Sequence, residues 1–199
     1  MSVSLISSPK TNSKVIISIK QSMIDFQYIF VKYYNDYIIQ ISYRSPSIYL
    51  DGIYLTVPNE IFKTAKIYNT GHKSNTTLIM KATDPIISSW CALLYKINKC
   101  LHASVMQMFQ KEEHQDQAKN KDSKNHKLIQ YKPFIKLTKT RSGDNIYMIM
   151  INDYKLIEKR DDTSKIESTP DIPIVFYITE INRYYNNYYC RATLNYKYL

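Results

Sequence analysis

The stretch from Thr76 to Gln110 limits the possible folds most, because a strand pattern is followed there by a long amphipathic helix. Leu78 to Met80 form a short apolar run that suits a strand. Asp84 is a good N-cap, and Pro85 suits the first helical position. Apolar residues then recur every three or four positions, which predicts a helix of about six turns with a buried stripe: Ile87, Trp90, Leu94, Ile97, Leu101, Val105 and Met108. We expect the stripe to pack on a sheet, so functional side chains should lie on the strands that the helix supports.

The charge of the chain favours a polyanionic partner. Its 199 residues carry a formal net charge of +10, with a pI near 9.3. This length suits one hydrophobic core, and such a charge favours nucleic acid over a small acidic molecule. Lysine, asparagine, isoleucine and tyrosine are abundant, which a coding sequence rich in A and T also produces. The charge therefore permits nucleic-acid binding without proving it.

The cysteine pattern predicts neither disulfides nor a zinc site. Cys91, Cys100 and Cys190 lack C-x-x-C spacing, so we expect buried thiols in a reducing compartment. The first residues lack the apolar core of a signal peptide, and no stretch reaches the roughly 18 apolar residues of a membrane span. A soluble intracellular protein without membrane contact is expected.

The sequence lacks the usual signatures of catalysis. It contains no glycine-rich phosphate loop, no G-x-S-x-G and no H-E-x-x-H. The paired carboxylates Glu112-Glu113 and Asp161-Asp162 fall in polar, lysine-rich segments, where solvated side chains are expected. His114 and His126 lie in the same kind of segment. We expect no enzymatic activity, no metal and no cofactor.

The N-terminal part of the chain is predicted to be mainly β. Residues 1–13 are expected to form a flexible arm, and residues 14–199 a single domain. Val15 to Ile19 suits a first strand. Tyr28 to Tyr43 favours a hairpin that turns at Asn35-Asp36, with an amphipathic helix over residues 22–32 as the alternative. Residues 48–57 suit a strand with Gly52 at a bend. Residues 59–75 fit a short helix or a strand equally well.

Two polar segments interrupt the pattern further along. Residues 111–127 contain only Ala118 as an apolar residue, so we expect a mobile surface loop there. Residues 154–171 are also polar and predict another loop or short connection. Between and after these segments, the sequence predicts two β-hairpins.

The first of these late hairpins has its turn at Ser142-Gly143-Asp144, with arms over residues 134–138 and 146–151. Strict alternation would point Ile135 and Leu137 to the core, while Phe134 and Lys136 face outward. A basic hairpin that bears rings suits single-stranded nucleic acid, because cations follow phosphates and rings stack on unpaired bases. An ordinary solvated hairpin fits this segment equally well.

The second hairpin pairs residues 174–179 with residues 188–198 across a turn near Asn186-Asn187. Its last strand has two distinct faces. One face carries Tyr188, Cys190, Ala192, Leu194 and Tyr196, and we expect Ala192 and Leu194 to point inward. The other face carries Tyr189, Arg191, Thr193, Asn195 and Lys197. The candidate nucleic-acid-binding residues on the two hairpins are Lys132, Phe134, Lys136, Lys139, Arg141, Tyr147, Arg183, Tyr184, Tyr185, Tyr189, Arg191 and Lys197.

The predicted elements match a β-rich α+β fold: an OB-fold-like Greek-key barrel with a long helix inserted between strands and two late hairpins. The same content fits other α+β folds. The order of segments resembles the poxvirus single-stranded DNA-binding phosphoprotein family. Four stretches carry the resemblance, and they span somewhat more than the C-terminal half of the chain: TTLIMKATDPIISSWCALLYKI, PFIKLTKT, NIYMIMIN and TPDIPIVFYITE.

The resemblance implies a protein that coats and protects single-stranded DNA during viral DNA replication in the host cytoplasm. Single-stranded DNA would be the main partner, bound without sequence preference. Self-association on DNA and contacts with viral replication proteins would accompany that role. A structural or interaction protein of a virion, with no nucleic-acid role, is the alternative that the sequence leaves open.

Overall fold

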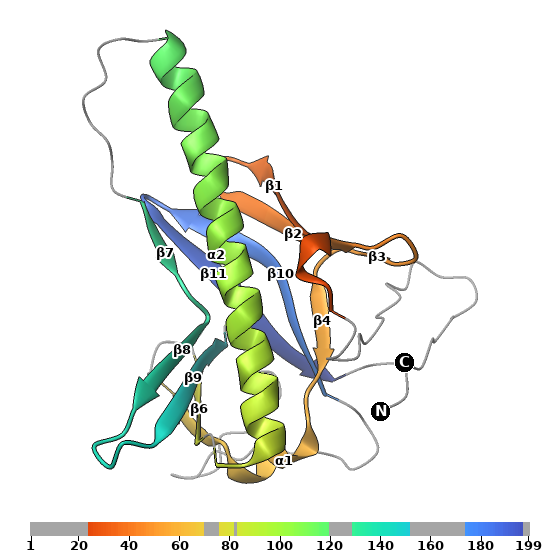
Figure 1. The fold of residues 1–199 in the computed structure, drawn as a ribbon, viewed down its shortest axis with the longest axis vertical. Coiled ribbons are helices and arrows are strands. Elements are labelled where there is room, and N and C mark those ends of the chain that lie inside the picture. The colour runs from red at the N-terminus through yellow and green to blue at the C-terminus, as the bar shows by residue number, and fades with distance from the viewer. Residues whose placement is uncertain (1–23, 70–75, 82, 120–128, 152–173, 197–199) are drawn as a thin grey trace.

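A single long helix, α2 (Pro85–Lys119), lies against two β-sheets built mainly from antiparallel strands (Figure 1). The computed structural model describes residues 24–69, 76–81, 83–119, 129–151 and 174–196. Over these residues the protein is β-rich α+β, which confirms the general class expected from the sequence. Helix α2 contacts strands of both sheets, and the buried side chains of the helix and the two sheets form one hydrophobic core.

The start of α2 forms as the sequence predicts. The Asp84 carboxylate accepts hydrogen bonds from the backbone N–H groups of Ile86 at 2.7 Å and Ile87 at 3.1 Å. It thereby satisfies two of the donors that a helix start leaves free. The apolar stripe is also confirmed. Met108 is half-buried, and the other members are fully buried: Ile87, Trp90, Leu94, Ile97, Leu101 and Val105.

The end of α2 differs from the prediction. The helix continues through Lys119, so residues 111–119 are helical, and the expectation of a loop is wrong for them. No glycine or proline occurs between Ile86 and Lys119, and Lys, Glu, Gln and Ala are good helix formers. A segment with almost no apolar residues can therefore extend a helix that is already anchored by packing. The rest of the predicted loop, residues 120–127, lies outside the described residues.

The larger sheet, sheet A, has seven strands in the order β1-β2-β10-β11-β7, with β3 paired to β2 and β4 paired to β10. All of these pairs are antiparallel except β7 with β11. A short 3-10 helix at Phe26–Tyr28 precedes the sheet. The strands are β1 (Ile29–Asn35), β2 (Ile38–Arg44), β3 (Tyr49–Leu50), β4 (Ile53–Thr56), β7 (Gln130–Lys132), β10 (Ile174–Tyr184) and β11 (Asn187–Tyr196).

The smaller sheet, sheet B, has four antiparallel strands in the order β5-β6-β9-β8. A short helix, α1 (Asn59–Thr64), connects β4 of sheet A to the first strand of sheet B. The strands are β5 (Lys66–Asn69), β6 (Thr76–Lys81), β8 (Ile135–Lys139) and β9 (Asn145–Ile151). Strand β7 leads directly into β8, so the chain passes from sheet A to sheet B at Pro133.

The three predicted hairpins form, although the turn of the first one lies one residue later than predicted. Strands β1 and β2 flank a turn at Asp36-Tyr37, where the Asn35 side chain accepts a hydrogen bond from the Tyr37 N–H at 2.8 Å. The helical alternative over residues 22–32 is wrong for its described part, because β1 begins at Ile29. Residues 59–69 contain both a helix and a strand. The predicted N-terminal arm and the strand at residues 15–19 lie outside the described residues.

Gly52 marks the point where the chain changes partner within sheet A. Its φ of +132° belongs to a region that favours glycine, and an added Cβ would lie 2.9 Å from the carbonyl oxygen of Ile178. Strand β10 has a bulge between Ile178 and Glu180. On one side of this bulge β10 pairs with β4, and on the other side it pairs with β2. The predicted strand at residues 48–57 is therefore two short strands separated by a bend at Gly52.

In the ranges that the structure describes, no helix combines the length and apolar character needed to cross a membrane.

Candidate nucleic-acid interface

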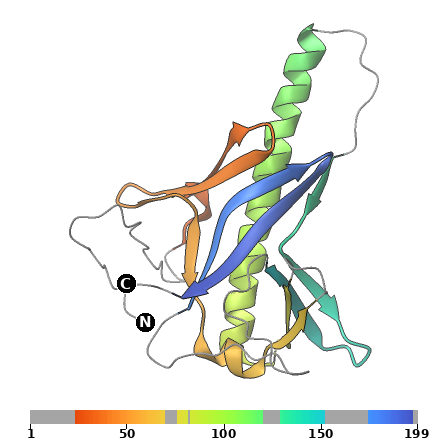
Figure 2. The ribbon, with the colours of Figure 1, turned by 180° about the vertical axis from the view of Figure 1, so that it is seen from behind.

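Sheet A has one face packed on α2 and one face that none of the described helices covers (Figure 2). Strand alternation puts Ile39, Ile41 and Tyr188 on the packed side, where all three are buried. On the other face of the sheet, the register aligns residues across five strands. Between β1, β2 and β10, Phe30 pairs with Ser42, Lys32 with Gln40, and Gln40 with Glu180. Between β10, β11 and β7, Asn182 pairs with Tyr189, and Tyr189 pairs with Lys132. We call this side the open face, with the residues Phe30, Lys32, Ile38, Gln40, Arg44, Lys132, Glu180, Asn182 and Tyr189.

Rings and cations interleave on the open face. Phe30 and Tyr189 are 47% and 41% exposed, which leaves ring surface available for stacking. Lys32 is exposed, and the half-buried Lys132 donates a hydrogen bond from its Nζ to Gln130 at 2.7 Å. Such a mixture suits a single strand, because unpaired bases stack on rings while ammonium groups neutralise phosphates.

A carboxylate also lies on this face. Glu180 is half-buried and accepts a hydrogen bond from the Asn182 amide at 3.0 Å. In the register, the backbone of Glu180 lies opposite Gln40 on β2 and opposite Arg191 on β11. The carboxylate is therefore part of a polar row in the sheet rather than an isolated negative charge.

The last strand has the two faces that the sequence predicts. Tyr188, Cys190, Ala192 and Leu194 are all buried, and Tyr189 between them is exposed. The expectation that Ala192 and Leu194 point inward is confirmed. The side chain of Arg191 and all of Lys197 lie outside the described part of the chain, so two predicted site residues stay as predictions.

Two predicted site residues are in the core. Phe134 is 1% exposed and packs against the ring of Phe176 with centroids 5.8 Å apart. The outward assignment of Phe134 is wrong because the chain bends at Pro133, so Phe134 precedes β8 instead of alternating within it. Tyr147 is also buried, on the side of β9 that faces α2. Burial raises the pKa of its hydroxyl, with smaller contributions from nearby Cys91 and Tyr95.

The prediction for Leu137 is also wrong, but here a residue expected in the core is exposed. It was expected in the core, yet it is 43% exposed. It lies opposite the buried Tyr147 in the register, but it belongs to β8, the edge strand of sheet B, in the hairpin that projects away from α2 (Figure 1). Ile135, at the start of β8, is buried as expected. Alternation therefore puts Leu137 on the same side as Tyr147, whereas its burial depends on whether the core extends to the edge strand.

The cations of the first late hairpin form a separate group. Lys136, Lys139 and Arg141 are all exposed, but they belong to the β8–β9 hairpin of sheet B. Gly143 provides the tight turn with a φ of +89°. The predicted site residues thus do not form one surface, because Tyr189 and Lys132 belong to sheet A and these three cations to sheet B.

Tyrosines gather where two hairpin turns of sheet A meet. Tyr184 and Tyr185 are 65% and 77% exposed, and their rings form an edge contact with centroids 4.7 Å apart. The Arg183 N–H donates to the carbonyl of Tyr37 at 2.7 Å, which holds the β1–β2 turn beside the β10–β11 turn. We call this group the tyrosine turns: Tyr34, Tyr37, Tyr184 and Tyr185, all of them exposed.

Arg183 has a role within its own turn. Its Nε donates to the carbonyl of Tyr185 at 3.2 Å, and its guanidinium lies over the ring of Tyr188 at 5.7 Å from the centroid. Tyr185 has a φ of +54°, a conformation uncommon for residues other than glycine. The hydrogen bond to its carbonyl helps to fix this backbone, so Arg183 has a structural role in the turn.

Several residues of the open face were missed by sequence reasoning. Phe30 and Lys32 on β1 and Arg44 on β2 come from the N-terminal hairpin, from which no site residue was predicted. A signal was present, because Phe30, Lys32 and Tyr34 alternate with apolar neighbours in YIFVKYYN. What the sequence could not show is that β2 pairs with β10 and so continues the same face.

The described residues provide little for nucleophilic or metal chemistry. Burial raises the pKa of the Cys91 and Cys190 thiols to about 12, so neither forms a thiolate readily near neutral pH. No group of three or more His, Cys, Asp and Glu residues within the described ranges could hold a metal ion. Side chains of the carboxylate pairs at residues 112–113 and 161–162, and of His114 and His126, lie outside that description.

Comparison of the chain with models of protein families, with curated proteins and with solved structures gave no match.

Proposed function

We propose that the protein binds single-stranded DNA with little sequence preference, along the open face of sheet A. The observation that carries the proposal is the alternation of exposed rings and cations on a sheet face that no described helix covers. Phosphates would be neutralised by Lys32 and Lys132, while bases stack on Phe30 and Tyr189. The formal net charge of +10 supports a polyanionic partner, because the positive field of the protein raises the concentration of DNA near its surface.

The likeness of sheet A to an OB-fold concerns only its binding face. In that fold, a curved antiparallel sheet presents an open side to a single strand. Sheet A offers a comparable open side, and α2 lies between strands in the chain as the predicted inserted helix does. Sheet A has seven strands, more than the five of an OB-fold barrel, so the likeness concerns the face and not the strand count.

The resemblance to the poxvirus DNA-binding family supplies the biological setting of the proposal. A protein of this kind would coat and protect viral single strands during replication and would associate with further copies on the DNA. One domain covers a short run of nucleotides, so coating a long strand works best when neighbouring copies touch. Sedimentation with and without a long single strand tests this part, and independent loading of copies would count against it.

The main test is a fluorescence-anisotropy titration of oligo(dT) at two salt concentrations. Each phosphate contact on a single strand makes log K fall by about 0.7 per tenfold rise in salt. We expect tight binding at low salt, a steep decline with salt and weaker binding of a duplex of the same length. Oligo(U) in parallel distinguishes DNA from RNA. Absence of binding at low salt would end the proposal.

Variants of β11 locate the binding face. Tyr189→Ala should weaken binding of oligo(dT) by about 1 to 3 kcal/mol, because one stacking ring is lost while the fold is kept. The matched change on the other side of the same strand, Leu194→Ala, should lower the free energy of unfolding by about 2 to 5 kcal/mol through lost burial and a cavity. A destabilised Tyr189→Ala together with a stable, binding-defective Leu194→Ala would contradict the assignment of the faces.

A virion protein that uses the same sheets for protein contacts is the second candidate function. The tyrosine turns favour it, because exposed tyrosines are enriched in protein interfaces and four of them lie together here. This candidate predicts that replacing Tyr184 and Tyr185 by serine leaves oligo(dT) binding unchanged while it weakens association with a protein partner.

A further inference from the structure

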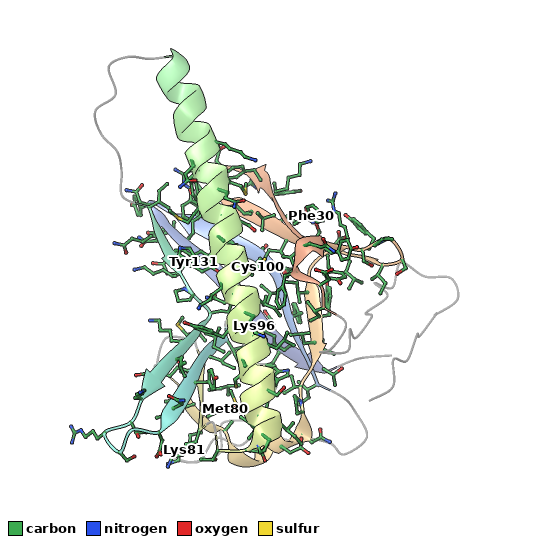
Figure 3. The ribbon with its side chains drawn as sticks, in the orientation of Figure 1. Phe30, Met80, Lys81, Lys96, Cys100 and Tyr131 are labelled. Atoms are coloured by element: carbon green, nitrogen blue, oxygen red, sulfur yellow. The ribbon has the colours of Figure 1, made fainter. Side chains whose placement is uncertain are left out.

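Arg44, at the end of β2, is held in place by residues from three strands. Its guanidinium carbon lies 5.2 Å from the ring centroid of Tyr49 and 5.9 Å from that of Phe30. Its Nε donates to the Ser42 hydroxyl at 3.0 Å. Tyr49 on β3 is the direct register partner of Arg44, and Phe30 on β1 is its diagonal neighbour. Phe30 lies near the place where β2 and β3 meet (Figure 3).

These contacts fix the direction of Arg44 without using up its binding capacity. The hydrogen bond to Ser42 occupies Nε, and cation–π contacts with the two rings restrict the plane of the guanidinium. Within the part of the chain that the structure describes, no carboxylate forms an ion pair with Arg44. The terminal nitrogens are therefore available to an external acceptor, and the usual entropic cost of ordering a long side chain is already reduced.

The exposure of the two rings argues against a purely structural role for this arrangement. Phe30 is 47% exposed and Tyr49 is 61% exposed, so the arginine does not seal them into the core. Ser42, in contrast, is buried. The result is a preorganised cation flanked by ring surface, on the same side of sheet A as Lys32 and Tyr189.

We propose that Arg44 is a phosphate-binding residue at the corner of the open face, and that Phe30 and Tyr49 both hold it in position and stack against neighbouring bases. The inference rests on the proposed function. A guanidinium presents a planar set of donors that matches two phosphate oxygens, whereas a lysine ammonium acts as a point charge. The ligand is a phosphodiester of the bound single strand.

The geometry extends the interface across the full width of sheet A. Lys132 lies on β7 and Phe30 on β1, at opposite ends of the order β1-β2-β10-β11-β7. With neighbouring strands about 4.8 Å apart, these two ends are separated by about 19 Å across the sheet. A DNA strand that reached from Lys132 to Phe30 would therefore cross all five β-strands, and it would contact residues of both the N-terminal and the C-terminal hairpin.

The test compares two substitutions that each remove one cation from an aromatic ring. Arg44→Gln removes it from the open face. Lys99→Gln removes it from α2, where the Lys99 ammonium lies 4.9 Å from the ring centroid of Tyr95. Both variants lose the same net charge. Affinity for oligo(dT) is measured by fluorescence anisotropy at several salt concentrations, and thermal unfolding confirms that each variant is folded.

We expect Arg44→Gln to weaken binding about tenfold and to reduce the slope of log K against log salt by about 0.7, the share of one phosphate contact. Lys99→Gln should leave the slope unchanged. Arg44→Lys keeps the charge but loses the planar donors and the Ser42 hydrogen bond, so its affinity should fall while its slope stays near that of the natural chain. Tyr49→Leu should behave like Arg44→Lys, because the cation remains but its support is lost.

Equal effects of Arg44→Gln and Lys99→Gln would overturn the inference, since Arg44 would then contribute only through net charge. Full affinity in Arg44→Lys and Tyr49→Leu would overturn the role of the rings and the planar donors. Both results leave the proposed function standing, provided that the natural chain binds oligo(dT). Failure of the natural chain to bind would overturn the proposed function, and this inference with it.

Discussion

The side-chain oxygen of Asn98 accepts a hydrogen bond from the backbone N–H of Phe134 at 3.3 Å. The same oxygen accepts from the Tyr131 hydroxyl at 3.2 Å. Asn98 is one of the two buried polar residues in the described core. It lies on α2, and its two donors lie on either side of Pro133, where the chain leaves sheet A for sheet B. One amide therefore ties the helix to the joint between the sheets.

Replacement of Asn98 by leucine should destabilise the fold. The buried Phe134 N–H and the Tyr131 hydroxyl would lose their acceptor, which costs about 1 to 3 kcal/mol per unsatisfied group. Urea unfolding followed by circular dichroism measures the change. Tyr131→Phe is the control: it removes one donor together with its need for a partner and should cost less. Equal stability of the natural chain and Asn98→Leu would contradict the role of this amide.

Gly52→Ala should lower the free energy of unfolding by more than about 1 kcal/mol, because the φ of +132° is strained for alanine and its Cβ would meet the backbone of β10. Gly143 provides a matched comparison. Its φ of +89° is also unfavourable for alanine, but an added Cβ there meets nothing within 4 Å. Gly143→Ala should therefore cost less than Gly52→Ala in the same denaturant titration, and the reverse order would refute the close approach at β10.

Phe134 and Leu137 should show the opposite of the stability pattern that simple alternation predicts. Phe134→Ala removes a fully buried ring and should cost about 3 to 5 kcal/mol. Leu137→Ala changes an exposed side chain near the hairpin tip and should stay within about 0.5 kcal/mol. Thermal unfolding of the two variants tests this. A stable Phe134→Ala would show that the bend at Pro133 is misplaced.

Stability should fall at alkaline pH. Burial raises the pKa of Cys91 and Cys190 from 9.0 to about 12, and the pKa of Tyr131 is also raised, mainly by burial. Below about pH 9 both thiols are protonated in the folded and unfolded chains, so their contribution is fully present. As the pH rises toward about 12, the unfolded chain releases these protons first, and the contribution is lost.

Urea unfolding at a series of pH values measures this loss. Cys190→Ala removes one of the buried thiols and should make the alkaline decline less steep, whatever its effect on stability at neutral pH. Cys100 is only half-buried and provides the control, because Cys100→Ala should change the slope less. An unchanged decline in Cys190→Ala would show that its thiol does not contribute.

Local patterns in the sequence predicted the elements well, and the errors have identifiable physical causes. The stripe from Ile87 to Val105 predicted the helix because packing on a sheet requires that spacing. The alternation around Tyr189 predicted β11 because one face of that strand is buried from Tyr188 to Leu194. Phe134 was misassigned because it was counted as the first residue of the alternating arm, whereas β8 begins at Ile135. The polar end of α2 was missed because an anchored helix needs no further apolar residues.

The candidate site was harder to predict than the fold. Tyr189 and Lys132 were chosen from local signals on the late hairpins. Arg44 and Phe30 join the same face only because β2 pairs with β10, and no local pattern reports that pairing. The residues that complete the open face therefore required the arrangement of strands.

The pairing of β2 with β10 joins Gln40 to Glu180, and that of β7 with β11 joins Tyr131 to Tyr188. Contacts between such distant parts of a chain are made late in folding, because the entropy of loop closure is lost before the contacts contribute. The β1–β2 and β10–β11 hairpins need only local contacts and can form early. A chain that has folded both hairpins but has not joined them has every ring and lysine of the open face, yet no surface on which they are aligned. We therefore expect the capacity for the proposed binding to arise late in folding, when β2 docks on β10 and β7 docks on β11.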